Sequence, residues 1–325
     1  MDREQVAALL AGARGCISGE EMSRALGVTR AAVWKEIEAL RQAGWPIQSS
    51  TRKGYSLAGP PPSLSAPYLS AQLPPDSLFA GKILVESVVD STNTRLKAMA
   101  AAGAPTGTVL IAEEQTGGRG TRGRSFQSPR GEGLYLSVLL RPRLTRLEDL
   151  LTLTGWVGVA ARDGVERASG APVRIKWLND LYLNGRKLCG ILTELSFLGE
   201  SGEPDYVVAG MGVNMSQTAD TFRAQGLGDI ATSLALEGFP VEQNHLAACL
   251  LTALDKLVRD FPEQRADYLE DYRAHCVTLG RRVSFETPDG PRTGTARGVD
   301  GRFALLVAGS DGISYAVSSG TVTML

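Results

Sequence analysis

The chain has 325 residues, of which 43% are hydrophobic, and its net charge is −1, so it is long enough for two or three globular domains and has no overall charge that would attract nucleic acid. The first residues lack the layout of a signal peptide and no apolar run reaches membrane-spanning length, which predicts a cytoplasmic protein. Four scattered cysteines without a C-x-x-C pair argue against zinc and against a disulfide framework (Cys16, Cys189, Cys249 and Cys276).

Three short helices are expected within residues 1–57, and the last two are joined by a tight turn. Ser18 and Glu21 form a capping box at the start of the second helix, and Gly27 supplies the turn. Thr29 caps the third helix, whose apolar residues are spaced to face inward (Val33, Ile37 and Leu40). Two short helices joined by a glycine turn are the helix-turn-helix pattern.

A small β wing is expected over residues 48–57. If the third helix enters a major groove, the candidate DNA contacts are the exposed start of that helix and the wing (Thr29, Arg30, Lys35, Arg52 and Lys53). Eight Lys/Arg minus six Asp/Glu gives +2 for residues 1–57, which is modest for a domain that binds phosphates. A helical domain used for packing or protein contact is the alternative.

A proline-rich stretch at residues 58–67 interrupts the chain. Such a segment is semi-rigid and cannot continue a helix or a central strand. We therefore expect a first domain at 1–60 and a large middle domain at 61–278.

The middle region alternates helix and strand. We expect a helix at 92–102, a strand at 134–140, a long helix at 147–168 with Trp156 on its apolar face, and a strand at 206–211. Ser91 or Thr92 would cap the first of these helices, and a capping role alone would explain both residues. The free N–H groups at a helix start also suit a polar ligand, so a binding role is the other interpretation.

A loop rich in glycine and arginine follows the apolar run at 109–112. Arg119, Arg122 and Arg124 lie among glycines at 118–124. Glycines let backbone N–H groups approach an anion, and guanidinium groups bind carboxylate or phosphate in a forked geometry. The loop also satisfies G-x-G-x-x-G, but turn formers follow it, so we reject a dinucleotide-binding helix. The loop predicts a site for a small anionic ligand, with a solvated basic loop as the alternative.

A second group of polar residues lies at 173–180. Apolar and basic residues alternate there, so a strand would bury one face and present Lys176 on the other. Asn179 and Asp180 then offer oxygen ligands of the kind that Mg²⁺ accepts beside a nucleotide. The pair Asn184–Gly185 predicts a tight hairpin. An ordinary strand with a partly buried lysine is the alternative.

The last segment, 279–325, differs in character from the middle region. Asp-Gly pairs at 289, 300 and 311 separate short β-rich runs. Regular turns of this kind predict a small β barrel as a third domain.

Several of these segments together resemble the biotin protein ligases. GRGTRGRSF is similar to the arginine-rich biotin loop of that family, KWLNDLYLNGRKLCGIL to its lysine motif, and residues 90–93 to the segment that opens its first helix. The resemblance continues through 210–214 and 231–234 and covers most of 80–280. Lipoate ligases are the weaker match, because their ligand loop differs.

The resemblance implies an α/β (α+β) ligase core of the biotin/lipoate ligase type, an N-terminal winged helix-turn-helix and a C-terminal SH3-like β barrel. It implies catalytic roles for Lys176, Arg119, Arg122 and Arg124, and a possible Mg²⁺ ligand in Asp180. The implied biotin-binding residues are Ser91, Thr92, Asn93, Gln115, Arg119, Gly120, Thr121, Lys176, Gly190, Gly210 and Gly212. The implied nucleotide-binding residues are Arg122, Arg124, Phe126, Lys176, Asn179 and Asn214.

The implied reaction joins biotin to ATP as biotinyl-AMP and passes biotin to a lysine of the biotin carboxyl carrier protein of acetyl-CoA carboxylase. Fixed positive charge and Mg²⁺ would reduce the repulsion between the biotin carboxylate and the phosphates, so Lys176→Ala is expected to abolish biotin transfer. A homodimer would place two winged domains on operator DNA, with biotinyl-AMP as corepressor. The alternatives are a ligase whose helix-turn-helix no longer binds DNA, a ligand-sensing regulator without catalysis, and a lipoate or octanoate ligase.

Two positions depart from the family pattern. Thr121 stands where arginine is common, and Phe126 where tryptophan is common. Because an arginine beside the intermediate adds a charge-assisted contact, we expect this chain to hold biotinyl-AMP less tightly than one with arginine at 121.

Overall fold

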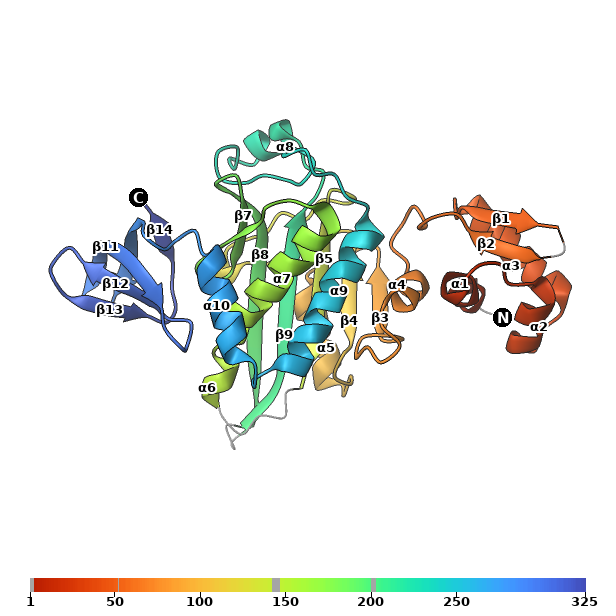
Figure 1. Ribbon diagram of the computed structural model, residues 1–325, viewed down its shortest axis with the longest axis horizontal. Helices are drawn as coiled ribbons and strands as arrows, with labels where there is room; N and C mark the ends of the chain where they lie inside the picture. The colour runs from red at the N-terminus through yellow and green to blue at the C-terminus, as the bar shows by residue number, and fades with distance from the viewer. Residues whose placement is uncertain (1–2, 52, 142–146, 200–202) are drawn as a thin grey trace.

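The computed structural model describes residues 3–51, 53–141, 147–199 and 203–325. Figure 1 shows a large central part, with the N-terminal part at one end of the long axis and the C-terminal part at the other. Each part has its own sheet, of two, seven and five strands respectively. Among the described residues, no helix combines the length and the apolar character that crossing a membrane requires.

The N-terminal part has the predicted helix-turn-helix pattern followed by a hairpin. Its elements are α1 (Arg3–Gly12), α2 (Gly19–Leu26), α3 (Arg30–Gln42), β1 (Ile47–Ser50) and β2 (Gly54–Leu57). Ser18 and Glu21 form both bonds of the predicted capping box, and Gly27 turns the chain at φ 66°. Thr29 accepts a hydrogen bond from Ala32 N. These predictions are confirmed, and the apolar face of α3 is buried as expected (Val33, Ile37 and Leu40).

The proline-rich stretch is held against the central part by a buried asparagine. The Nδ2 atom of Asn244 donates to the carbonyl oxygens of Pro61 and Ser63, at 3.1 and 3.0 Å. Its Oδ1 atom accepts from Ser65 N at 3.1 Å. Helix α4 (Ala66–Gln72) then packs against α1, and Tyr68 joins the N-terminal core. The N-terminal part is therefore attached to the central part in two ways, by the hydrogen bonds of Asn244 to residues 61–65 and by the packing of α4 against α1.

Replacing Asn244 by alanine is expected to lower the free energy of unfolding by about 1–3 kcal/mol, because buried backbone groups of residues 61–65 lose their partners. Urea denaturation measures this change. His245→Ala alters the exposed neighbouring side chain and is the matched control. Equal stability of Asn244→Ala and the unaltered protein would contradict the role given to this side chain.

The central sheet has the strand order β3-β4-β5-β9-β8-β7-β6. Only β3 and β4 are parallel; the other neighbours are antiparallel. The strands are β3 (Ile83–Glu86), β4 (Val109–Ala112), β5 (Gly133–Leu140), β6 (Arg174–Lys176), β7 (Asp180–Leu183), β8 (Arg186–Leu198) and β9 (Glu203–Asn214). The strands predicted near 134–140, 173–177 and 206–211 are confirmed, as is the hairpin turn at Asn184–Gly185.

Helices cover both faces of this sheet. Helices α7 (Leu153–Ser169), α9 (Gln243–Asp260) and α10 (Arg265–His275) lie over one face, and α5 (Thr92–Ala101) lies on the other (Figure 1). Leu96 and Ala100 of α5 pack in a separate cluster with three residues of the sheet, Leu110, Leu139 and Val208. The residues just before and after these three along their strands belong to the main core on the other face. This alternation is the two-residue period of a sheet buried on both faces.

One helix prediction was wrong in its extent. The segment predicted as a single helix at 147–168 forms α6 (Leu147–Leu150) and α7, with a break at 151–152. The Thr152 hydroxyl donates to the Asp149 carbonyl at 2.6 Å, and Leu151 is 66% exposed. Thr152 thus ends the first segment with a local hydrogen bond that competes with the helix. Trp156 is fully buried, as predicted.

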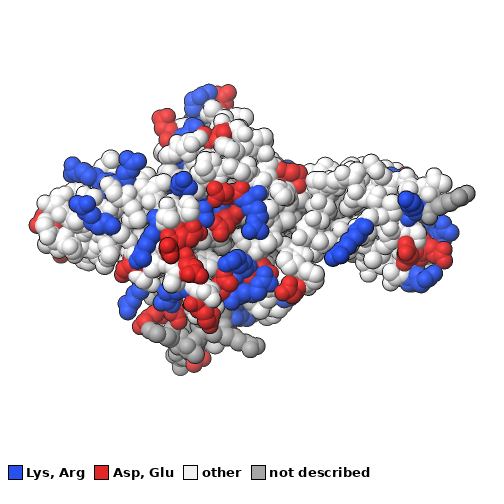
Figure 2. Space-filling model, in the orientation of Figure 1, with Lys and Arg blue, Asp and Glu red and all other residues white. Residues whose placement is uncertain are grey.

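Charged side chains of both signs are mixed over the helical face of the central part (Figure 2). Arg162 of α7, for example, pairs with Glu166 at 2.7 Å and with Asp271 of α10 at 3.0 Å. This mixing agrees with the near-zero net charge of the chain.

The C-terminal part is a five-stranded antiparallel sheet of order β13-β12-β11-β10-β14. Its strands are β10 (Arg282–Thr287), β11 (Gly290–Val299), β12 (Leu305–Gly309), β13 (Ser314–Val317) and β14 (Val322–Met324). Phe303 joins it to the central part: its carbonyl accepts from Trp177 Nε1 at 2.8 Å, and its ring meets Tyr272 edge-on at 5.2 Å. The small β structure predicted here is confirmed.

Candidate active site

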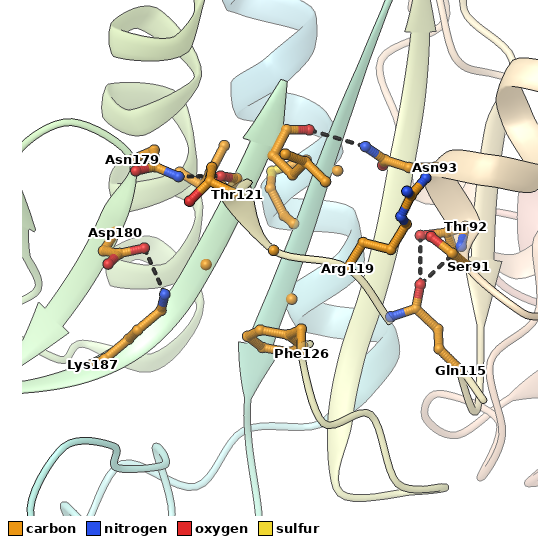
Figure 3. A pocket seen from close by; sticks show the side chains of 17 residues that line it. Ser91, Thr92, Asn93, Gln115, Arg119, Thr121, Phe126, Asn179, Asp180 and Lys187 are labelled. Carbon is orange, nitrogen blue, oxygen red and sulfur yellow. Dashed lines mark hydrogen bonds and ion pairs between the residues drawn. The ribbon is translucent and has the colours of Figure 1, made fainter. Parts of the chain in front are cut away.

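A pocket lies where the start of α5, the glycine-arginine loop and strands β8 and β9 meet (Figure 3). The glycine-arginine loop is residues 115–128, which contain the short helix η1 (Thr121–Gly123). Most of the predicted biotin-binding residues line this first pocket. They are Ser91, Thr92, Asn93, Gln115, Arg119, Gly120, Thr121, Gly190, Gly210 and Gly212.

The start of α5 supplies a polar end to the pocket. Ser91 has the extended backbone of an N-cap, but its side chain makes no capping hydrogen bond. Thr92 donates from both its backbone N and its hydroxyl to Gln115 Oε1, at 2.8 and 3.1 Å. Ser91 lines the pocket, and capping by its side chain does not account for it, since that hydrogen bond is not made.

A network behind this polar end holds Asn93. Its Nδ2 atom donates to Leu192 O at 3.1 Å and to Glu194 Oε2 at 2.8 Å, and its Oδ1 lies 2.6 Å from the Ser137 hydroxyl. Burial alone would raise the pKa of Glu194, but hydrogen bonds from Lys97 and Asn93 outweigh it and hold that pKa below its usual value. Sequence analysis missed Ser137 and Glu194, since neither belongs to a recognisable motif.

Two glycines of β9 are needed because other groups approach their Cα atoms closely. A Cβ added to Gly210 would lie 2.0 Å from Asn93 Oδ1, and one added to Gly212 would lie 2.4 Å from the Phe126 ring. The Phe126 ring also approaches Gly190. Strand β9 thus presents bare backbone at Gly210 and Gly212, which line the pocket together with Gly190.

For the biotin ligase that the sequence resemblance implies, Gly210→Ala is expected to raise KM for biotin roughly two- to tenfold, because Asn93 must move and lose a hydrogen bond. The KM is measured by biotin-dependent exchange of pyrophosphate into ATP. Gly301→Ala, where the new methyl group meets open space, is the control. An unchanged KM for Gly210→Ala would show that Asn93 does not need its present position.

The glycine-arginine loop folds back on itself as a narrow hairpin. Gly120 N donates to Arg124 O at 2.7 Å, and Phe126 N donates to Gly118 O at 2.8 Å. Arg122 adopts a left-handed conformation with φ 57°. Arg124 Nη2 donates to Thr321 Oγ1 of the C-terminal part at 3.2 Å. The loop thus covers the first pocket while its arginine-rich tip touches the C-terminal sheet.

A second pocket adjoins the first. It is lined by Lys176, Arg124 and Asn214, by Phe222 of α8 (Ala219–Ala224), and by Gln217, Gln225, Leu227, Ile230 and Ala231 around that helix. Five residues line both pockets: Gly120, Thr121, Phe126, Asp180 and Lys187. Four predicted nucleotide-binding residues therefore lie around the second pocket, namely Arg124, Phe126, Lys176 and Asn214, whereas Asn179 lines the first. Arg122 lines neither pocket; it lies beside Gly320.

The two lysines of the sequence motif occupy different positions. Lys187 of β8 lines both pockets, and its Nζ lies 2.7 Å from Asp180 Oδ1. Lys176 of β6 lines only the second pocket, with its Nζ 5.4 Å from the centre of the Tyr182 ring. Burial lowers the pKa of the Lys176 ammonium group, although Asp180 opposes the shift.

Sequence analysis did not single out Lys187. The predicted hairpin contained the missing signal, because a two-residue turn at Asn184–Gly185 returns the following strand to the level of Asp180. Lys187 pairs with Tyr182, which shares a strand face with Asp180 two residues away, so the Lys187 ammonium reaches that carboxylate. The first pocket consequently contains an ammonium group from β8, not the one expected from β6.

The side chains predicted as oxygen ligands are held in place by protein groups, Asn179 through its amide nitrogen and Asp180 through its carboxylate. Asn179 Nδ2 donates to Ile191 O at 2.6 Å, and Asn214 Nδ2 donates to Thr232 O at 3.0 Å. Asp180 pairs with Lys187. The described residues contain no group of three or more His, Cys, Asp or Glu side chains that could hold a metal by themselves. A single carboxylate fits Mg²⁺ that is bound mainly by substrate phosphates and water.

The predicted DNA contacts lie on α3 and the hairpin. Arg30, Lys35 and Lys53 are exposed, whereas the Thr29 hydroxyl is used as the cap of α3. Arg52 lies outside the described residues.

Three family patterns match the chain in order. They are "HTH domain" at residues 2–56, "Biotin/lipoate A/B protein ligase family" at 85–214 and "Biotin protein ligase C terminal domain" at 278–325. The "Bifunctional ligase/repressor BirA" of Bacillus subtilis is 33% identical over 305 residues, which are 93% of this chain and 92% of that protein. The chain belongs to the biotin protein ligase family. The predicted fold class is thereby confirmed.

Other members of the biotin protein ligase family extend the comparison. BirA of Escherichia coli is 34% identical over 312 residues, 94% of this chain and 92% of that protein. The biotin protein ligase from Aquifex aeolicus in complex with biotin and ATP matches with a TM-score of 0.63 and 26% identity, over 75% of this chain and 99% of that one. The resemblance to lipoate ligases is weaker, because the C-terminal match is to a domain described for biotin protein ligases.

Proposed function

We propose that this biotin protein ligase joins biotin to ATP and transfers it to a lysine of the biotin carboxyl carrier protein of acetyl-CoA carboxylase. In the first step, a biotin carboxylate oxygen bonds to the α-phosphorus and the bond to the β-phosphate oxygen breaks, so pyrophosphate leaves. In the second, the acceptor amine attacks the acyl carbon, loses a proton, and AMP leaves. The observation that carries the proposal is the set of residues, including Lys187 and Asp180, that lines both pockets.

The first pocket suits biotin and the second suits the nucleotide. Ser91, Thr92 and Gln115 present polar groups at the closed end, where the ureido ring of biotin would bind, while Asn93 positions them through Ser137. Gly190, Gly210 and Gly212 let the backbone approach biotin, as part of the first pocket lining. Phe126 would contact the nucleotide at the shared boundary, and Asn179 and Asn214 would keep the two pocket walls in place.

Positive charge gathers where the two anions have to meet. The Lys187 ammonium lies at the shared boundary, so it can contact the biotin carboxylate and the α-phosphate at once. Arg119 would stabilise the carboxylate side, and Arg124 and Lys176 the phosphate side, whereas Arg122 lies beside Gly320 outside both pockets. Such fixed charges lower the barrier because they need no rearrangement as negative charge develops. Mg²⁺ would arrive with ATP and use Asp180 as its protein ligand.

We further propose that the protein is a transcriptional repressor in the cytoplasm. In this proposal its three domains are residues 1–60, 61–278 and 279–325. In this proposal a homodimer carries biotinyl-AMP as corepressor and places two α3 helices on one palindromic operator. Two relatives named ligase/repressor support it, since their match to this chain covers 92% of the length of each relative. The alternative is a ligase whose N-terminal domain no longer binds DNA.

Two assays test these proposals. Incubation with biotin, Mg²⁺, ATP and a purified carrier domain should add the mass of one biotinyl group to the carrier; no added mass would reject the ligase proposal. A mobility shift with the promoter of the organism's biotin synthesis genes should require biotin and ATP. Transfer to the carrier without any promoter binding would leave the ligase-only alternative.

A further inference from the structure

Helix α3 exposes a large aromatic side chain that its own domain does not use. Trp34 is 58% exposed, whereas the other three tryptophans of the chain, Trp45, Trp156 and Trp177, are at most 8% exposed. The buried face of α3 is complete without it, since Val33, Ile37 and Leu40 form that face (Figure 1 shows α3 in the N-terminal part). An exposed indole on a small domain leaves apolar area in water that a partner can cover.

Trp34 lies in a hollow that four elements of the winged helix-turn-helix form together. Arg30 and Ala31 of α3 line it beside Trp34, and the start of α2 closes one side with Gly19 and Glu20. The hairpin closes another side with Ser49 and Ser50 of β1 and Gly54 and Tyr55 of β2. Arg30 and Trp34 are four residues apart on one helix, so their side chains share a face. The cationic Arg30 and the apolar indole therefore point at the same partner.

We propose that Trp34 is a specificity-determining residue that contacts thymine methyl groups in the major groove of the operator. This inference rests on the DNA-binding part of the proposed function. DNA is the favoured partner because Arg30 lines the hollow beside the indole, and two further exposed cations lie on the same domain, Lys35 next to Trp34 in α3 and Lys53 on the hairpin. In a helix-turn-helix the second of the two helices, here α3, places its exposed face in the major groove. The thymine methyl group is the apolar feature that side chains recognise there.

The expected pattern of affinities is specific to this role. Trp34→Ala should weaken binding to the promoter fragment roughly 5- to 150-fold and leave binding to unrelated DNA unchanged. The same fragment synthesised with deoxyuridine in place of thymidine lacks the methyl groups, and the unaltered protein should lose similar affinity for it. Trp34→Ala should lose nothing further on the deoxyuridine fragment. Trp34→Phe, which keeps an apolar ring, should retain most of the preference for thymine.

The experiment uses the full-length protein saturated with biotin and ATP, and anisotropy of labelled DNA as the readout. Lys35→Ala is the matched control, since a phosphate contact affects all sequences alike and reduces the salt dependence. Equal loss of affinity for operator and unrelated DNA in Trp34→Ala would overturn the inference, as would indifference of the unaltered protein to deoxyuridine. The deoxyuridine arm needs no variant, so it decides even if Trp34→Ala folds poorly. Failure of the unaltered protein to bind the promoter would reject the repressor proposal itself.

Discussion

Replacing Lys187 by alanine is expected to lower the rate of biotinyl-AMP formation roughly 100- to 1000-fold, the usual effect of removing one group that stabilises developing charge. The reason is its position: of the two candidate lysines, only Lys187 lines both pockets. Lys176→Ala is expected to act mainly on the nucleotide side and to raise KM for ATP. Exchange of labelled pyrophosphate into ATP, dependent on biotin, measures both constants.

The controls separate catalysis from folding. Lys187→Ala leaves Asp180 without its ion pair, so the Tm of Lys187→Ala is measured beside the exchange, and an unchanged Tm assigns the lost rate to catalysis. Lys187→Arg keeps the positive charge and should retain more activity than Lys187→Ala. If Lys176→Ala abolishes the exchange while Lys187→Ala leaves it intact, the assignment from the sequence motif is correct and the one from pocket geometry is not.

Thr121→Arg is expected to slow release of biotinyl-AMP about 10- to 150-fold, the equivalent of 1.5–3 kcal/mol for one charge-assisted hydrogen bond. Thr121 lines both pockets, so a guanidinium group introduced there lies next to both halves of the intermediate. Release is followed by rapid mixing of the loaded protein with excess unlabelled biotin and ATP.

Thr121→Gln lengthens the side chain without charge and should change the release rate far less than Thr121→Arg. Similar effects of glutamine and arginine would mean that size, not charge, retains the intermediate. Equal release from Thr121→Arg and the unaltered protein would show that Arg122 already supplies the contact that arginine at 121 would add.

Local signals in the sequence predicted those parts of the fold that depend on near neighbours. The capping box at Ser18 and Glu21 and the turn at Gly27 are fixed by residues within a few positions, and the strand at 134–140 follows from its apolar run. The break at Thr152 was not predictable in this way, because apolar residues continue through it. The hydrogen bond from the Thr152 hydroxyl decides the local conformation there.

The candidate site was predicted where a motif is contiguous and missed where distant segments meet. The loop arginines and the start of α5 were found from the sequence. Ser137 and Glu194 act through contacts across the sheet, with residues more than forty positions away, so no local pattern reveals them. Lys187 was missed because its partner Asp180 lies on the other strand of the hairpin, so the contact appears only when the pairing across the turn at Asn184–Gly185 is followed.

The hold of Asn244 on Pro61, Ser63 and Ser65 limits how this protein can be re-engineered. Residues 61–65 act as a rigid connection and not as a flexible linker, because their peptide groups are hydrogen-bonded to Asn244 of α9. A hybrid protein could carry another DNA-binding domain in place of residues 1–60. The orientation of that domain relative to the ligase core would be kept only if residues 61–65 are retained. Extending the chain with a flexible insert before Pro61 would free the module while the ligase core keeps its own contacts.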